Sequence, residues 1–107
     1  MTEFDPEKFE EKYVHYFEEL EAAYSNAYDQ LHGRYESEIL RAIDRKVLSE
    51  SEPVYVGDRE FRIELPDERV EDVRAAVDDT EQFDTVLAEF RERIADELVR
   101  SFEFDDA

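Results

Sequence analysis

Large apolar residues recur every three or four positions across residues 9–35, and no other feature of this chain limits its fold as strongly. They are Phe9, Tyr13, Phe17, Leu20, Tyr24, Ala27, Tyr28, Leu31 and Tyr35. At about 100° per residue these positions fall on one side of a helix, in a stripe roughly 100° wide. Asp5 and Pro6 supply a capping residue and a proline for the first turn. The pattern predicts a long amphipathic helix over about residues 6–32.

A second helix is expected over about residues 34–49, after Gly33. Its apolar residues are Ile39, Leu40, Ile43 and Val47, and they lie in a shifted phase. Glycine inside a helix costs about 1 kcal/mol relative to alanine, so Gly33 should mark a break or a kink. One bent helix that runs through Gly33 is the alternative.

The segment PVYVGDREFRIELP carries the β signal of the chain. Apolar and polar residues alternate on both sides of Gly57 and Asp58, which predicts a hairpin over about residues 54–65. An isolated hairpin is only marginally stable in water. It should therefore pack Phe61, Ile63 and Leu65 on a helix or join a hairpin of another subunit.

Two more helices are expected after the hairpin, a short one over about residues 67–77 and a longer one over about residues 80–102. The longer helix has apolar residues at the spacing of paired helices, namely Phe83, Leu87, Phe90, Ile94 and Leu98. We therefore expect one domain over residues 1–107 that is mostly α with a single β-hairpin (α+β). Its long amphipathic helices should pack as a helical bundle or in coiled-coil-like pairs.

The charge of the chain indicates its surroundings more than its partners. There are 32 acidic residues against 13 basic ones, a formal net charge of −19, yet 41% of the residues are hydrophobic. This balance is typical of proteins from extreme halophiles, where molar salt reduces the screening length to about 3 Å. An acidic interaction protein of a mesophile is the alternative.

The residue content excludes several classes of protein. Cysteine is absent, which excludes disulfides and thiol catalysis and favours a reducing cytoplasm. No apolar run approaches the roughly 20 residues that cross a bilayer, so we expect no membrane association. Two glycines cannot form a Gly-rich phosphate loop, and the basic residues are too diluted by acids for a nucleic-acid surface. We expect no catalytic residue, no cofactor and no nucleic-acid partner.

One spacing could bring metal ligands together on a helix. Asp29 and His32 are three residues apart and Glu36 follows four residues later, so the three side chains could share a helix face. Such spacing arises easily in a chain with 32 acidic residues. We assign no metal site and keep these residues as weak candidates.

The aromatic stripe is the remaining candidate for function. A stripe of this kind is usually core or a helix-pairing surface, but its tyrosine hydroxyls suit a half-wet protein interface. The sequence predicts a non-enzymatic protein that associates with itself, with a dimer favoured, and then with an unidentified protein partner. The residues expected at this surface are Tyr13, Tyr16, Phe17, Leu20, Tyr24, Tyr28 and Leu31.

Two resemblances accompany these patterns. The stretches EKYVHYFEELEAAY, SEILRAIDRKVLSESEPVY and FRIELP resemble a family of small acidic haloarchaeal proteins of unknown function. The segment PVYVGDREFRIEL resembles in its architecture the hairpin of prefoldin β-type subunits, which joins two coiled-coil helices and assembles with neighbouring hairpins. The second resemblance implies a prefoldin-like chaperone subunit as an alternative function. A metal-binding helical-bundle enzyme is a further alternative.

Overall fold

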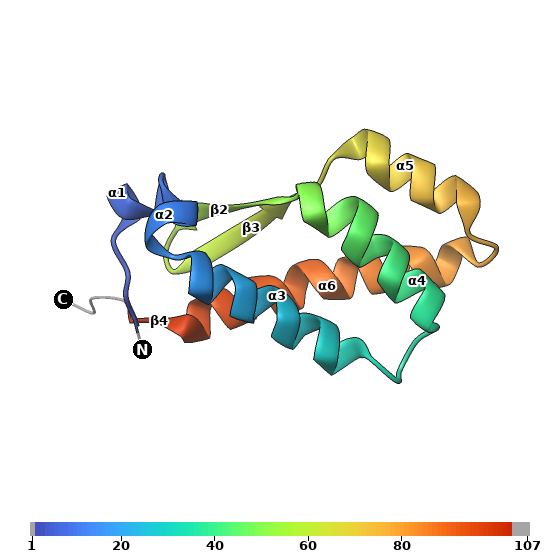
Figure 1. The fold of residues 1–107 in the computed structure, drawn as a ribbon, viewed down its shortest axis with the longest axis horizontal. Coiled ribbons are helices and arrows are strands. Elements are labelled where there is room, and N and C mark those ends of the chain that lie inside the picture. Colours follow the sequence, from blue (N-terminus) through green and yellow to red (C-terminus); the bar gives the residue numbers. More distant parts are fainter. Residues whose placement is uncertain (1, 104–107) are drawn as a thin grey trace.

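Two long helices, α3 (Phe17–Leu31) and α6 (Thr80–Ser101), lie side by side in the computed structural model, which describes residues 2–103 (Figure 1). The buried stripe of α3 consists of Leu20, Ala23, Ala27 and Leu31. That of α6 consists of Phe83, Val86, Phe90, Ile94 and Leu98. The spacing predicted for helix pairing is thus used within one chain, between α3 and α6. Ala23 and Ala27 are fully buried on α3, and such short side chains allow two helices to pack closely.

The helix predicted over residues 6–32 is divided into three helices, so the prediction of one continuous helix was wrong. The chain forms α1 (Pro6–Phe9), α2 (Lys12–His15) and α3. The backbone leaves the helical region at Glu11 (φ −113°, ψ 46°) and at Tyr16 (φ −128°, ψ 24°). These breaks turn Phe9 and Tyr16 toward the end of the molecule, where both rings are buried.

The buried and half-buried rings at this end form an aromatic cluster that explains the breaks. Its members are Phe4, Phe9, Tyr16, Tyr55, Phe61 and Phe102. The Tyr16 ring lies 4.8 Å from that of Phe102, and its hydroxyl accepts a hydrogen bond of 3.0 Å from the backbone N–H of Asp5. Burial of several rings with a satisfied hydroxyl outweighs two short interruptions of a helix.

The helical region after Gly33 has three parts that follow one another. They are α4 (Ser37–Ala42), the π-helical turn η1 (Ile43–Val47) and the 3₁₀ turn η2 (Leu48–Glu50). The chain leaves α3 at His32, and Gly33 has a φ of +89°, which other residues rarely adopt. The helix expected over about residues 34–49 therefore starts later, at Ser37.

The hairpin packs on a helix of its own chain. Strand β2 (Glu52–Gly57) pairs antiparallel with β3 (Glu60–Glu64), with Pro53 opposite Ile63 and Tyr55 opposite Phe61. Strand β3 lies against α6, and Phe61 and Ile63 are buried while Leu65 is half-buried. Of the two arrangements expected for the hairpin, the structure shows packing on a helix.

One helix and one pair of short strands complete the fold. Helix α5 (Asp67–Ala76) packs against η1 and buries Val73. Strands β1 (Thr2–Glu3) and β4 (Phe102–Glu103) form a short parallel pair that brings the two ends of the described chain together (Figure 1). The sequence patterns did not predict this pair.

The fold class is the predicted one: a mostly helical α+β structure with a single antiparallel hairpin. Every helix within residues 2–103 is too short or too polar to cross a membrane. The single domain expected over residues 1–107 includes positions 1 and 104–107, which lie outside the described residues.

Replacing Leu31 by alanine should test the α3–α6 contact. Leu31 is fully buried, so Leu31→Ala should lower the free energy of unfolding by about 2–5 kcal/mol in urea denaturation. Leu87→Ala makes the same chemical change on α6 at a half-buried position and should cost less. Equal losses in the two variants would contradict the assignment of Leu31 to the core.

Candidate protein-binding site

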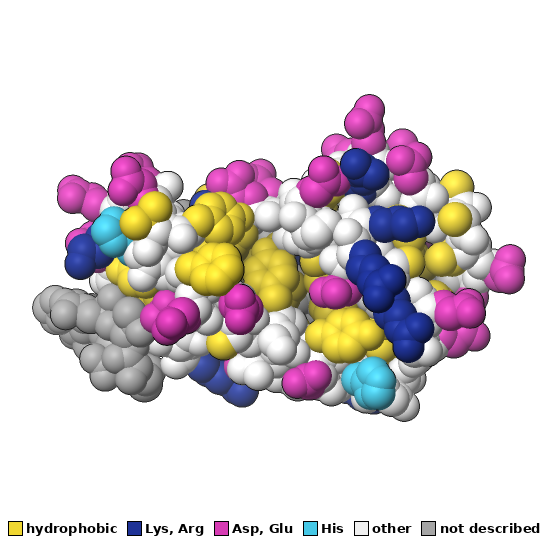
Figure 2. Space-filling view, in the orientation of Figure 1, with side chains coloured by type: hydrophobic (Ala, Val, Ile, Leu, Met, Phe, Trp, Pro, Cys, Tyr) yellow, Lys and Arg dark blue, Asp and Glu magenta, His cyan; other side chains and the backbone are white. Residues whose placement is uncertain are grey.

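An apolar groove lies between the first turns of α3, the turn η2 and the start of β2. Its volume is about 210 Å³, and its lining residues are Tyr13, Phe17, Leu20, Glu21, Tyr24, Leu48, Ser49, Ser51 and Pro53. Figure 2 shows apolar side chains gathered on the face that carries α3 and β2. Small-molecule sites usually enclose about 300–1,000 Å³. This groove is smaller and suits one large side chain of a partner.

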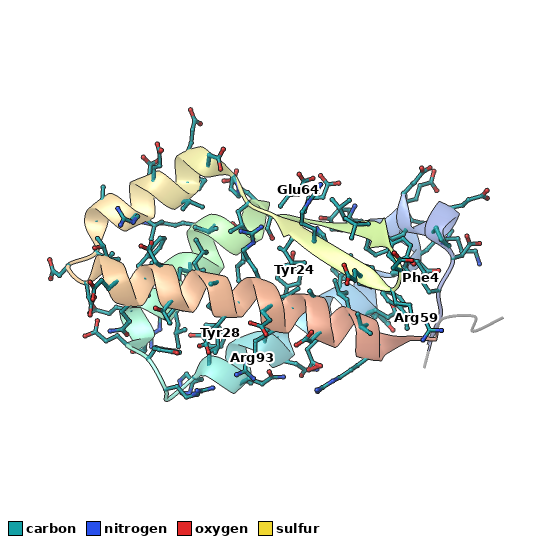
Figure 3. The ribbon with its side chains drawn as sticks, turned by 180° about the vertical axis from the view of Figure 1, so that it is seen from behind. Phe4, Tyr24, Tyr28, Arg59, Glu64 and Arg93 are labelled. Atoms are coloured by element: carbon teal, nitrogen blue, oxygen red, sulfur yellow. The ribbon has the colours of Figure 1, made fainter. Side chains whose placement is uncertain are left out.

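The floor of the groove contains a short chain of hydrogen bonds. The hydroxyls of Tyr24 and Ser51 are 2.8 Å apart, and the Ser51 hydroxyl donates to the Leu48 carbonyl oxygen at 2.7 Å. Because Ser51 uses its proton on Leu48, Tyr24 is the donor to Ser51. Figure 3 labels Tyr24, which reaches from α3 to the residue just before β2. Burial raises the pKa of Tyr24 from 10.0 to about 12.

Three large apolar side chains are exposed in α2 and at the start of α3, and two of them, Tyr13 and Phe17, line the groove. Tyr13, Val14 and Phe17 are 59%, 76% and 54% exposed. Large rings are usually withdrawn from water, and exposed apolar side chains that gather at one place mark interaction sites. We call these three residues together with the groove the docking face.

A buried cation, Lys12, contacts the Tyr13 ring of the docking face. Lys12 is 6% exposed and forms an ion pair of 3.0 Å with Glu52 on β2. Its ammonium lies 5.3 Å from the centre of the Phe9 ring and 5.4 Å from that of Tyr13. These cation–π contacts help to fix the orientation of the exposed Tyr13 ring. A ring that is already fixed loses little entropy when a partner covers it.

The predicted interaction residues divide between this face and the core. Tyr13, Phe17, Leu20 and Tyr24 line the groove, although Leu20 is buried and Tyr24 is half-buried. Tyr16 and Leu31 are buried in the core of the chain and do not line the groove. Tyr28 is half-buried, and its ring centre lies 6.3 Å from that of Phe90 and 6.1 Å from that of His32.

The candidate metal residues are not assembled. Within residues 2–103 no group of three or more His, Cys, Asp or Glu residues could hold a metal ion. The physical reason is the end of α3 at Leu31, which leaves Asp29 on the helix and His32 at its cap. Glu36 follows the turn at Gly33, so the helical spacing that relates the three residues does not continue.

Sequence patterns did not identify several residues of the docking face. Leu48, Ser51 and Pro53 reach the groove because the chain reverses at η2 and enters β2. No local pattern indicates that reversal. Val14 could have been identified from the sequence as an exposed apolar residue, because it lies outside the predicted stripe.

The described residues thus define a small helical protein with one hairpin and an exposed aromatic docking face. The chain belongs to the Family of unknown function (DUF5783), whose profile matches residues 1–105. No curated protein and no solved structure matches the chain.

The burial of Tyr24 predicts a loss of stability at high pH. Its pKa is higher in the folded chain than in the unfolded one, so its stabilising contribution is complete below pH 10 and declines as pH rises to about 12. Denaturant titrations across this range should show a shallower decline for Tyr24→Phe than for the parent chain. Identical slopes would contradict the burial of this hydroxyl.

Proposed function

We propose that this chain is a non-enzymatic protein-interaction module that binds through its docking face. The observation that carries the proposal is an apolar groove lined by two aromatic side chains, Tyr13 and Phe17, that are each more than half exposed. Aromatic anchors that enter well-packed pockets contribute most of the binding energy in many interfaces. The hydroxyl of the exposed Tyr13 suits the boundary between the apolar centre of an interface and water.

The first partner is a second copy of the chain. One face carries both a groove and projecting rings, so it can complement itself across a twofold axis. Each copy then inserts an aromatic side chain of its rim into the groove of the other. A dimer is the simplest assembly of this kind, and an unidentified protein partner binds the chain after or beside it.

The charge sets the conditions for association. At −19 per chain, two copies repel each other in dilute salt. Molar salt shortens the screening length to about 3 Å and strengthens apolar contacts, so association should increase with salt. The proposal therefore includes a halophilic, cytoplasmic and archaeal setting.

The two alternative functions, a prefoldin-like chaperone subunit and a metal-binding enzyme, have less support from the packing of the chain. Phe61 and Ile63 of the hairpin are buried against the chain's own α6, so the hairpin offers fewer apolar side chains for a prefoldin-like assembly. The groove is also smaller than most small-molecule sites. These features favour a macromolecular partner at the docking face.

Phe17→Ala should weaken self-association by about tenfold or more, because it removes a large exposed ring at the centre of the proposed interface. Sedimentation velocity or light scattering over a concentration series in about 2 M KCl measures the effect. Phe17 is 54% exposed, so its removal should leave the fold intact by circular dichroism.

Val56→Ala is the matched control for this variant. Val56 is also exposed, at 48%, but it lies on β2 outside the docking face. Its replacement should leave the dissociation constant unchanged. Equal behaviour of the two variants, or a parent chain that stays monomeric at every concentration, would count against the proposed function.

A further inference from the structure

The hairpin has two outer edges that differ in their backbone groups. Within residues 2–103, β2 and β3 pair with each other and with no third strand. Pro53 on β2 lies opposite Ile63 on β3. Because proline has no N–H, this pair is of the type that exchanges no hydrogen bonds across the ladder. The backbone groups of both residues therefore point outward, away from the facing strand.

Only the edge of β3 offers both a donor and an acceptor at this level. On β2, Pro53 interrupts the row of donors, which is a common protection of an edge strand. On β3, Ile63 presents an N–H and a C=O, and in the described part of the chain neither group forms a hydrogen bond. Ile63 is only 2% exposed. Buried backbone groups without a partner are rare because they cost free energy, so this edge suits an added strand.

A groove of about 550 Å³ runs along this edge of β3. Its lining includes the buried Phe61 and the exposed Arg62, which belong to opposite faces of the strand, so the groove follows the edge of β3. Helix α6 forms the other wall, where Ala88 and Ala95 have short side chains. Figure 3, which views the molecule from behind, shows β3 beside α6.

We propose that an extended segment of a partner protein binds in this groove as a third strand of the hairpin, antiparallel to β3. Hydrogen bonds to the N–H and C=O of Ile63 hold the backbone of the segment, and every second side chain faces α6. The groove shares no lining residue with the docking face. This inference therefore goes beyond the proposed function and does not depend on it.

The charges of β3 define the sequence of the segment. Glu60, Arg62 and Glu64 are exposed and alternate in sign on the outer face of the strand. Arg62 and Glu64 lie 3.6 Å apart, but both are more than half exposed, so their ion pair contributes little. Arg91 and Glu92 also line the groove, and their charges cancel. Cross-strand pairs of opposite charge thus favour a basic, an acidic and a basic residue, with apolar residues between them.

A bare segment fits this groove better than the hairpin of a second copy. In the antiparallel register centred on Arg62, that residue would meet its own counterpart, and Glu60 would meet Glu64. Shifted registers avoid these like charges but pair fewer residues. In every register the second β3 would also bring its own α6 along the same edge, against the first α6.

A short synthetic peptide with blocked ends tests the site. Lysine, valine, glutamate, valine and lysine follow one another in it, between two threonines. We expect its titration into isotope-labelled chain, at the lowest KCl concentration that keeps the chain folded, to shift the NMR amide signals of Ile63 and of α6 between Ala88 and Ala95. No shift at millimolar peptide, or shifts confined to the docking face, would overturn the proposal.

Two N-methylated peptides test the backbone contact. In an antiparallel added strand, the N–H of the first valine points to Ile63, whereas that of the central glutamate points away from β3. Methylation of the valine nitrogen should abolish binding, and methylation of the glutamate nitrogen should leave the dissociation constant largely unchanged. Equal effects of the two methyl groups would show that no such strand is added.

Arg62→Glu tests the charge pattern. This variant should bind the original peptide roughly fivefold more weakly, because one cross-strand pair changes from opposite to like charge. A peptide with lysine in place of the central glutamate should restore the affinity. Arg100→Glu is the matched control, because it makes the same change at an exposed position on α6 outside the groove. If both variants bind the two peptides alike, the predicted pattern is wrong.

The outcomes separate this inference from the proposed function. Peptide binding can be measured on the Phe17→Ala variant at concentrations where that variant is monomeric, so it does not require self-association. A loss of self-association in Arg62→Glu, seen by sedimentation velocity, would instead mean that β3 pairs with a second copy and that the partner segment is wrong.

Discussion

The packing of α3 on α6 is the contact on which the rest of the structure depends. Ala23 and Ala27 are fully buried on α3, and Phe83 and Phe90 are fully buried on α6. Each large side chain buried in this way contributes about 1.5–3 kcal/mol. At the edge of the contact, Gln30 donates to Glu97 at 3.1 Å and accepts from Arg93 at 3.0 Å (Figure 3 labels Arg93). This contact fixes which side of α3 faces solvent, and thereby where the docking face lies.

The aromatic residues of the N-terminal region have two separate roles. The break at Tyr16 turns that ring into the cluster at the end of the molecule, whereas Phe17 begins α3 on the exposed side. Neighbours in the sequence thus belong to the core and to the surface.

Periodicity was sufficient to predict the fold class, the hairpin and the two helices after it, because these depend on local alternation and on glycine and proline signals. It could not predict the breaks at Glu11 and Tyr16, because their cause is a ring cluster that includes Phe102 from the far end of the chain.

The candidate site could be predicted only in part, for the same reason. Tyr13, Phe17 and Tyr24 were recognisable as aromatic residues at helical spacing, but Pro53 joins them only through the chain reversal at η2. Sequence spacing also could not decide whether Leu20 and Leu31 pair with α6 or with another copy.

Hydrogen–deuterium exchange at low and high protein concentration tests the central claim most directly. The account predicts that α6 is protected equally at both concentrations, because it pairs with α3 inside one chain. It predicts added protection at high concentration in α2 and in the first turns of α3, where the docking face lies. Added protection confined to α6, or none in any segment, would contradict the division of α3 into an inner core face and an outer binding face.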